Sequence, residues 1–530
     1  METKKRTYME AIKHIPDNAV IGTSSFGIGG LPEQLIAGVG EYYEEYQHPK
    51  NITLVTTAGI GVGKGRGLDH LIKPGLLKRA VVSHIATSPI ANRAAHENYY
   101  ELFMIPQGMI GKLYQNAASQ GPGVFSKVGI DTFVDPNNEG GKMNDKSKDS
   151  EDIVGSIELN GERWLHYKPL PINVAFIKAS YADENGNLSM KRESAFLESL
   201  SLATAAHNAG GIVIAQVEEM VKNQSIPAQE VQVPGMLVDY VVVNEKPEYH
   251  MQTAGTVYSP ILSNEIRIAR DSKYYKKPLD PKRVMVRRAS QEIPKGSIVN
   301  LGNGIAASVG EVIAEADALK DYNLTTDLGG VGGLPATGWN YAPNINAEAV
   351  INTEDMFSLY HGNGLDVAVL GFGQMNQLGN MNTTKIGDRF IGPGGMIDIS
   401  YGADKIVFVG THVVKGKTEV ADGKIIITEE GIGPKFVSDL PYITFSAESA
   451  HKMGKEILVI TDRAVFDFTE EGQMRLIEIA PGLNLEKDVL DWMDFKPVIS
   501  DQLREMDAAL FNEDWTKADL EKKNLNKKKE

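Results

Sequence analysis

Six clusters of glycine constrain the fold of this 530-residue chain more than any other feature of its sequence. Glycine accounts for 53 residues, or 10% of the chain, against a background of about 7%. The clusters span residues 22–30, 59–67, 302–304, 329–333, 362–373 and 392–395. Most of them follow a short apolar run with β-branched residues, the pattern of a strand that ends in a tight turn. Because glycine permits a positive φ or a close approach to a ligand, the sequence predicts an α/β sheet whose carboxyl edge forms a site.

The length of the chain predicts two to four compact domains. Hydrophobic residues make up 42% and charged residues 23%, which is typical of a globular protein. Strand-like runs alternate with helical stretches, so we expect βαβ units and mostly parallel sheets. A segment rich in lysine and proline interrupts this pattern near residue 272. We therefore expect an N-terminal domain at residues 1–275, a linker at 276–285, a C-terminal domain at 286–515, and a charged tail at 516–530 that frays in solvent.

The second half of the chain repeats the pattern of the first. In both halves a β-branched run leads through a glycine turn into a helix, in AVIGTSSFGIGGLPEQLIAG and in SIVNLGNGIAASVGEVIAEA. Asn51-Ile52-Thr53 and Asn323-Leu324-Thr325 then each precede a further glycine-rich stretch. The repeat predicts two tandem open domains of similar fold, with the active site between them.

The charge and the missing residue types exclude several classes of function. The formal net charge is −15, which argues against a dedicated nucleic-acid-binding protein. Cysteine is absent, so disulfides, thiolate metal sites and cysteine nucleophiles are excluded. No apolar run is long enough for a membrane span, and no secretory signal is visible. We expect a cytoplasmic, multidomain enzyme that needs neither a membrane nor nucleic acid.

The repeat singles out Asp327. When Asn51 is aligned with Asn323, Val55 of the first half matches Asp327, and GGVGG follows one residue later. A carboxylate at the carboxyl end of a parallel strand, before glycines that expose the backbone, lies where α/β enzymes place their chemistry. Aspartate also hydrogen-bonds its own backbone at turns. The pattern alone therefore leaves a catalytic and a structural role open.

A nucleotide-dependent oxidoreductase is an interpretation from a different class. Residues 302–307 fit the dinucleotide fingerprint G-x-G-x-x-A between a strand and a helix, and Asp321 or Asp327 follows roughly 20 residues later. The matching turn of the first half has Pro32 where the third small residue belongs. The fingerprint is thus present in only one of the two halves.

Long motifs recur along roughly residues 8–515. In chain order they are DNAVIGTSSFGIGGLPEQLI, IPQGMIGKLYQ, VGIDTFVDP, VPGMLVDYVVV, VNLGNGI, NAEAVI, GNGLDVAVLGFGQMNQLGNMN and GPGGMIDIS. In sequence and in order these motifs resemble those of family I CoA-transferases (the 3-oxoacid CoA-transferase family), in particular the single-chain acetate/propionate CoA-transferase branch. The resemblance implies two tandem α/β domains and a ping-pong reaction through a covalent enzyme–CoA thioester. It also implies a homo-oligomer, a dimer or tetramer, with CoA as a substrate and no metal or prosthetic group.

Asp327 stands where the family has its catalytic glutamate. An arm shorter by one methylene withdraws the carboxylate by about 1.5 Å, and a misplacement of about 1 Å can cost about 100-fold in rate. Three outcomes are open. The backbone compensates and Asp327 accepts the acyl group; water enters and Asp327 acts as general base of a short-chain acyl-CoA hydrolase; or the chain is a non-catalytic CoA-binding protein.

Further site residues follow from the same resemblance. Gln107 matches the glutamine of the family's oxyanion hole, and Gly395 matches the glycine that supplies its backbone N–H. His361 departs from the aspartate that close relatives usually carry, and we consider that it pairs with Asp327 or serves as a base. Glu348, Glu354 and Asp355 are the nearby carboxylates that we consider as alternative nucleophiles to Asp327.

The phosphates and pantetheine of CoA require backbone N–H groups at glycine turns and helix N-termini. The residues we expect to contact CoA are Gly302, Asn303, Gly304, Gly362, Asn363, Gly364, Gly371 and Gly394. Lys64, Arg66, Arg287 and Arg389 are candidate cationic partners, although surface charges of this kind are common. Together these features predict an enzyme of short-chain fatty acid metabolism that exchanges CoA between short-chain acyl-CoA and acetate or similar carboxylates.

Overall fold

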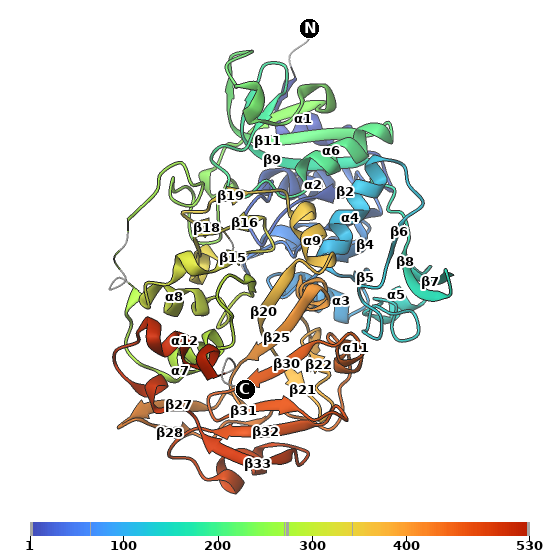
Figure 1. The fold of residues 1–530 in the computed structure, drawn as a ribbon. Coiled ribbons are helices and arrows are strands. Elements are labelled where there is room, and N and C mark those ends of the chain that lie inside the picture. The colour runs from blue at the N-terminus through green and yellow to red at the C-terminus, as the bar shows by residue number, and fades with distance from the viewer. Residues whose placement is uncertain (1–3, 64, 270, 272–274, 342, 527–530) are drawn as a thin grey trace.

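The structure, a computed structural model, describes residues 4–526 except residues 64, 270, 272–274 and 342. Two large sheets dominate it, one built by the first half of the chain and one by the second (Figure 1). Both have a parallel centre that is covered by helices. The prediction of two tandem, mostly parallel α/β domains is therefore confirmed.

The first sheet is parallel along its whole main path. Its strands lie in the order β1 (Lys5–Arg6), β13 (Tyr240–Val243), β11 (Ile212–Val221), β9 (Val174–Asp183), β2 (Val20–Thr23), β3 (Ile52–Thr56), β4 (Leu77–Val82) and β5 (Glu101–Met104). Two short strands, β10 (Leu188–Ser189) and β12 (Val231–Val233), add an antiparallel branch next to β9. The carboxyl ends of β2 to β5 consequently meet at one edge, where the site lies.

The second sheet is parallel in the middle and has antiparallel pairs on both sides, and its last strand on one side is again parallel to its neighbour. Its strands lie in the order β19 (Ala349–Val350), β16 (Gly330–Val331), β15 (Asn323–Thr325), β14 (Ile298–Leu301), β20 (Leu365–Gly371), β25 (Ala403–Val409), β30 (Glu456–Ile460), β31 (Ala464–Phe468), β32 (Met474–Ile479) and β33 (Val498–Glu505). The hairpin strands at β16 and β19 fold back from the end of β15. This return carries the chain over the residues that follow β15.

The two halves share a five-strand unit, so the internal repeat is confirmed. The order β3-β2-β9-β11-β13 in the first sheet matches β15-β14-β20-β25-β30 in the second, and all pairs are parallel. The strand register corrects one detail of our alignment. With Val20 laid on Ile298, Thr53 pairs where Asn323 pairs. The first-half residue that matches Asp327 is therefore Thr57, and our alignment to Val55 was wrong by two residues.

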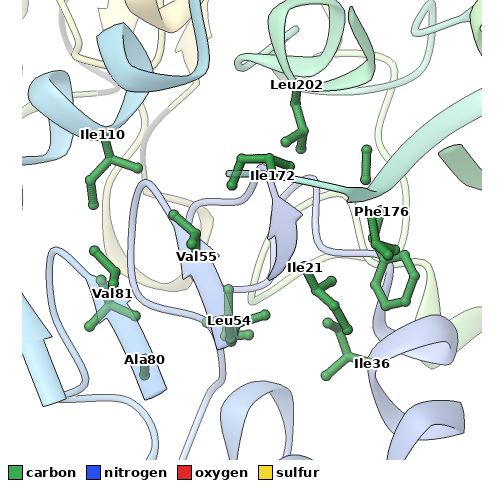
Figure 2. Close-up of a cluster of buried hydrophobic side chains, with 14 of the residues drawn as sticks. Ile21, Ile36, Leu54, Val55, Ala80, Val81, Ile110, Ile172, Phe176 and Leu202 are labelled. Carbon is green, nitrogen blue, oxygen red and sulfur yellow. The ribbon is translucent and has the colours of Figure 1, made fainter. Parts of the chain in front are cut away.

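The core of the first domain shows how helices cover both faces of its sheet. Figure 2 shows Leu54 and Val55 pointing to opposite faces of β3, Val55 toward Ile110 of α4 (Gln107–Ala118). Leu202 of α6 (Ser199–Asn208) lies on the same side as Ile110, and Ile36 of α2 (Glu33–Tyr46) lies on the other. Alternation along a strand that is buried on both faces explains why the strand sequences are continuously apolar. Among the described residues, no helix has the length and hydrophobicity needed to cross a membrane.

Two helices lie where we expected irregular chain. Helix α7 (Pro281–Ser290) begins inside the expected linker at 276–285, and its Val284 is buried in the second core. Helix α12 (Lys517–Asn526) occupies most of the expected tail, with Leu520 completely buried in the same core. The expectation of a tail that frays in solvent missed this buried leucine between charged residues. The domain boundaries themselves stay predictions.

Candidate active site

Asp327 lies at the carboxyl end of β15, in a turn that requires glycine. The turn closes through hydrogen bonds from the Thr326 N–H to the Gly330 carbonyl at 3.1 Å and from the Gly329 N–H to the Thr326 carbonyl at 3.0 Å. Gly329 has a φ of +98°, and a Cβ there would lie 1.9 Å from the Ile351 carbonyl oxygen. The backbone after Asp327 is therefore fixed against the return strand β19, and the carboxylate of Asp327 is only partly exposed.

Gln107 and Gly395 flank the Asp327 carboxylate from the two domains. Gln107 is the first residue of α4, and its side chain lies close enough to the Asp327 carboxylate to favour the ionised form. Gly395 is the N-cap of α10 (Met396–Gly402), and a Cβ at Gly395 would lie 3.1 Å from Asp327 Oδ2. Among the described residues, the Gly395 N–H donates a hydrogen bond to no group. The structure thus brings together the three residues that we expected to form the catalytic centre.

A loop of the second domain is hydrogen-bonded to the edge of the first sheet. The Gly394 N–H donates to the Ser83 carbonyl at 3.2 Å, and the Gly394 carbonyl accepts from the Gln107 N–H at 3.1 Å. Gly392 has a φ of +101°, and a Cβ there would lie 2.3 Å from the Ser83 carbonyl oxygen. Only glycine allows this approach, so the loop places Gly395 and Gln107 relative to each other.

The environment of Asp327 raises the pKa of its carboxyl group. Burial raises the pKa of the Asp327 carboxyl to about 6, and the charge of Asp398 acts in the same direction. Its own backbone N–H and the side chain of Gln107 favour the ionised form. At neutral pH the carboxylate is mostly ionised while its affinity for a proton is raised, as is common for active-site carboxylates.

His361 pairs with Asp398 and not with Asp327, so this part of our hypothesis for His361 was wrong. His361 ends helix α9 (Thr353–His361), and its Nε2 lies 2.9 Å from Asp398 Oδ1. The other oxygen, Oδ2, accepts the backbone N–H of Gly108 at 3.0 Å. Asp398 is completely buried. Helix α9 packs beside α4 of the first domain (Figure 1), so these contacts cross between the domains.

Comparison with known proteins places this architecture in a family. A family model described as coenzyme A transferase matches residues 5–244. Caffeate CoA-transferase of Acetobacterium woodii is 41% identical over 511 residues, which cover 96% of this chain and 97% of that protein. Acetate CoA-transferase YdiF of Escherichia coli K12 is 39% identical over 95% of this chain and 94% of its own length. The chain belongs to the family I CoA-transferases.

The fold of a solved relative agrees with this assignment. The crystal structure of the acyl-CoA transferase YdiF from Escherichia coli O157:H7, a thioester complex with CoA, matches with a TM-score of 0.90 at 37% identity and covers 97% of each chain. The α subunit of citrate lyase from Streptococcus mutans, at 15% identity and a TM-score of 0.55, shares the fold alone. The protein is an enzyme of the CoA-transferase type, and the oxidoreductase interpretation is not supported.

Four of the eight residues that we expected to contact CoA lie on the same sheet edge as the transferase's Asp327. Residues 302–304 directly follow β14, and Gly371 ends the neighbouring strand β20. The Gly302 N–H donates to the Val369 carbonyl at 2.9 Å, which joins the two turns. Gly304, with a φ of +82°, and Gly371 have open space where a Cβ would lie. Gly394 belongs to the loop next to Gln107.

Residues 362–364, three further residues that we expected to contact CoA, lie at the opposite edge of the second sheet. They connect α9 to the amino end of β20, whereas Gly371 ends this seven-residue strand. An extended strand of this length spans roughly 20 Å. The structure therefore does not bring Gly362, Asn363 and Gly364 together with the other glycine turns, because a glycine cluster in sequence can span both edges of a sheet.

The candidate cations are already engaged. Arg66 pairs with Glu33 at 3.2 Å, and Arg389 donates to the Ala86 carbonyl at 2.8 Å. Arg287 is completely buried in the second domain, where it donates to backbone carbonyls near Trp515. Lys64 lies outside the described residues. Of these four, Arg287 serves the core of the second domain and not the site.

The three alternative carboxylates differ in their surroundings. Glu348 and Asp355 are exposed. Glu354 is buried and accepts a hydrogen bond from Ser201 Oγ at 2.6 Å. The buried Glu198 of the first domain lies next to Glu354 across α4. Neither Glu198 nor Glu354 contacts the oxyanion donors, so Asp327 is the carboxylate that the geometry favours.

Sequence reasoning missed Asp398 and Glu198. Asp398 is the only charged residue in the motif GPGGMIDIS, and it lies three residues after Gly395. A lone carboxylate in an apolar stretch is a signal, because a buried charge needs a partner. Glu198 lies among polar and apolar residues with no such pattern, and its burial depends on the contact between the domains.

Proposed function

We propose that this CoA-transferase exchanges CoA between short-chain acyl-CoA thioesters and acetate or similar carboxylates, with Asp327 as the acyl acceptor. The observation that carries the proposal is the position of the Asp327 carboxylate, which lies beside Gly395 and is close enough to the Gln107 side chain for that side chain to lower its pKa. The names of the similar enzymes, among them acetate CoA-transferase YdiF, support the choice of acceptor.

The proposed reaction has four chemical steps. The Asp327 carboxylate attacks the thioester carbonyl, the C–S bond breaks, and a mixed anhydride and CoA thiolate form. The thiolate then attacks the Asp327 carbonyl of the anhydride, which releases the first carboxylate and leaves CoA on Asp327 as a thioester. An incoming acetate attacks this thioester, and the same two steps in reverse give acetyl-CoA and free Asp327. A carboxylate nucleophile suits this exchange because the thioester energy is retained.

Each step passes through a tetrahedral centre with a negative oxygen. The side-chain amide of Gln107 and the N–H of Gly395 are the two donors that could stabilise it. Gly395 is the N-cap of α10. Because both donors already lie against Asp327 in the free enzyme, little reorganisation is required.

The position of Asp327 also bears on whether its side chain, one methylene shorter than glutamate, extends far enough into the site. Asp327 Oδ2 lies 3.1 Å from where a Cβ of Gly395 would be, so the carboxylate lies beside this proposed oxyanion donor although it lacks one methylene of the usual glutamate. This supports transfer over hydrolysis, since hydrolysis requires a water between the carboxylate and the acyl group.

CoA itself is proposed to bind along the carboxyl edge of the second sheet. Gly302, Asn303, Gly304 and Gly371 would line the path of pantetheine and the phosphates toward Gly394, since their turns adjoin and leave open space. A homo-oligomeric state and a cytoplasmic location stay predictions.

The test uses purified wild type and Asp327→Asn with propionyl-CoA, with and without acetate. Acetyl-CoA is followed by chromatography, and free CoA thiol by a colour reagent. Because the chain contains no cysteine, the thiol background is low. We expect acetate-dependent acetyl-CoA from the wild type and a loss of at least about 1000-fold in the variant, because the nucleophile is removed.

Glu348→Gln serves as the matched control, since it neutralises an exposed carboxylate near the site. It should transfer CoA at the wild-type rate. Thiol release without acetyl-CoA in the wild type would show that water is the acceptor and would contradict the proposed transfer. Full activity of Asp327→Asn would show that another group is the nucleophile.

A further inference from the structure

A hydrogen-bonded chain connects His361 to the first turn of α4. His361 Nε2 lies 2.9 Å from Asp398 Oδ1, and the Gly108 N–H donates to Asp398 Oδ2 at 3.0 Å. Both carboxylate oxygens are thus used, one by a side chain of the second domain and one by the backbone of the first. Gln107, which reaches Asp327, directly precedes Gly108.

Tight packing around Gly108 fixes the contact between its N–H and Asp398. A Cβ at Gly108 would lie 2.7 Å from Asp398 Oδ1 and 2.6 Å from Phe357 Cγ. Phe357 also lies 3.3 Å from the Cβ position of Gly395, and its ring centroid is 6.0 Å from that of His361. The carboxylate of Asp398, the ring of Phe357 and the start of α4 therefore form one close-packed unit.

Asp398 depends on His361 to remain in this position. Asp398 is completely buried, and a buried carboxylate is stable only when its oxygens are hydrogen-bonded or paired. The nearest lysine, Lys112 of α4, interacts with Asp398 electrostatically, but its Nζ donates to Ser358 Oγ at 3.1 Å. Among the described residues, His361 is the only side chain that directly donates to Asp398.

We propose that His361 is a positioning residue for catalysis: through Asp398 and the Gly108 N–H it fixes the first turn of α4 and so aims the Gln107 amide at the oxyanion. This inference rests on the proposed function, because it assumes that Gln107 is an oxyanion donor. A donor displaced by about 1 Å can lower the rate about 100-fold.

The test compares His361→Leu with His361→Gln. Leucine removes the donor, and we expect kcat to fall 10- to 100-fold while KM for acyl-CoA changes less than about threefold, since the loss affects the transition state. Glutamine can place an amide N–H near the position of Nε2, and it should restore kcat to within about fivefold of the wild type. Hydrogen–deuterium exchange of the peptide around Gln107 should increase in the leucine variant and not in the glutamine variant.

The control is His96→Leu. His96 also faces an aspartate, Asp388, at 3.5 Å, but both are exposed and neither is hydrogen-bonded to Asp398 or Gly108. It should retain wild-type kcat, and thermal unfolding verifies that each variant is folded. Wild-type kcat in His361→Leu, or an equal loss in the leucine and glutamine variants, would overturn the inference. If Asp327→Asn is inactive in the same assay, such a result contradicts the role of His361 and leaves the role of Asp327 intact.

Discussion

The two halves of the chain share a five-strand unit but end their equivalent strands differently. After β3 the first half has Thr57, whose Oγ1 donates to Glu198 Oε2 at 3.1 Å. After β15 the second half has Asp327, whose carboxylate faces Gly395 and Gln107. The first position is thus used for a buried polar contact, whereas the second carries a carboxylate at the open edge of its sheet.

This difference shows how the two repeats of a duplicated fold can contribute different residues to one site. In the proposed mechanism, the second half supplies the nucleophile and one oxyanion donor, Gly395. The first half supplies the other proposed donor, Gln107, at the start of α4. Neither sheet edge is complete without the other, so the catalytic centre depends on the contact between the loop at 391–395 and the first sheet.

Gln107→Leu tests whether the first half contributes to catalysis at all, and we expect a large effect. Leucine keeps the volume of this buried side chain but removes the amide, so kcat for CoA transfer should fall about 100- to 1000-fold, as for other oxyanion donors. Steady-state kinetics with propionyl-CoA and acetate measure the loss. Gln115→Leu, on the same helix, is the matched control and should be close to wild type. A kcat for Gln107→Leu within threefold of wild type would mean that the second half works alone.

The pH dependence of kcat/KM tests whether the residue after β15, Asp327, reacts as an ionised carboxylate, which Thr57 after β3 cannot do. Asp327, with its pKa raised to about 6 by burial, must be ionised to attack a thioester. The kcat/KM for acyl-CoA should therefore be constant above about pH 7 and fall about tenfold per pH unit well below pH 6. A profile measured from pH 5 to 8 in a buffer of constant ionic strength gives the midpoint. A kcat/KM that stays constant down to pH 5, as for an aspartate with a pKa in its ordinary range near 4, would contradict the influence of burial on the free enzyme.

The sequence predicts the architecture well because its signals are local. Apolar strands that end in glycine clusters, and the repeat of this pattern, were enough for two parallel α/β domains. Asp327, Gln107 and Gly395 were found through the resemblance, and the structure brings them together.

What the sequence could not supply depends on contacts between distant segments. The pairing of His361 with Asp398 joins two helices that are separated by a whole strand, and no spacing predicts it. Glycine turns likewise do not reveal which edge of the sheet they occupy, which is why residues 362–364 were grouped with 302–304. The buried leucine of α12 was hidden by the charges around it.

A pair of buried carboxylates, Glu198 of the first half and Glu354 of the second, contrasts with Asp327. Both are buried, and Glu198 Oε1 and Glu354 Oε2 have no hydrogen-bond partner among the described residues. Burial raises the pKa of Glu198 to about 8, and the charge of Glu354 adds to this. Burial likewise raises the pKa of Glu354 to about 7. At neutral pH we therefore expect this pair to hold a proton, whereas Asp327 has lost its own.

Glu198→Gln tests this protonated state through stability, with the smallest effect of the series. Because the native state keeps a proton that the unfolded chain releases above about pH 4.5, the wild type should lose stability as the pH rises toward 8. Glutamine carries no titrating proton, so the variant should lose less stability over this range. Since 1 kcal/mol corresponds to roughly 2–4 °C in domains of this size, the Tm of the variant should gain at least that much on the wild type between pH 6 and 9. Glu348→Gln should keep the wild-type slope in the same thermal scans. Parallel curves for wild type and Glu198→Gln would show that Glu198 is ionised in the folded protein, and the contrast with Asp327 would then be one of position and not of charge.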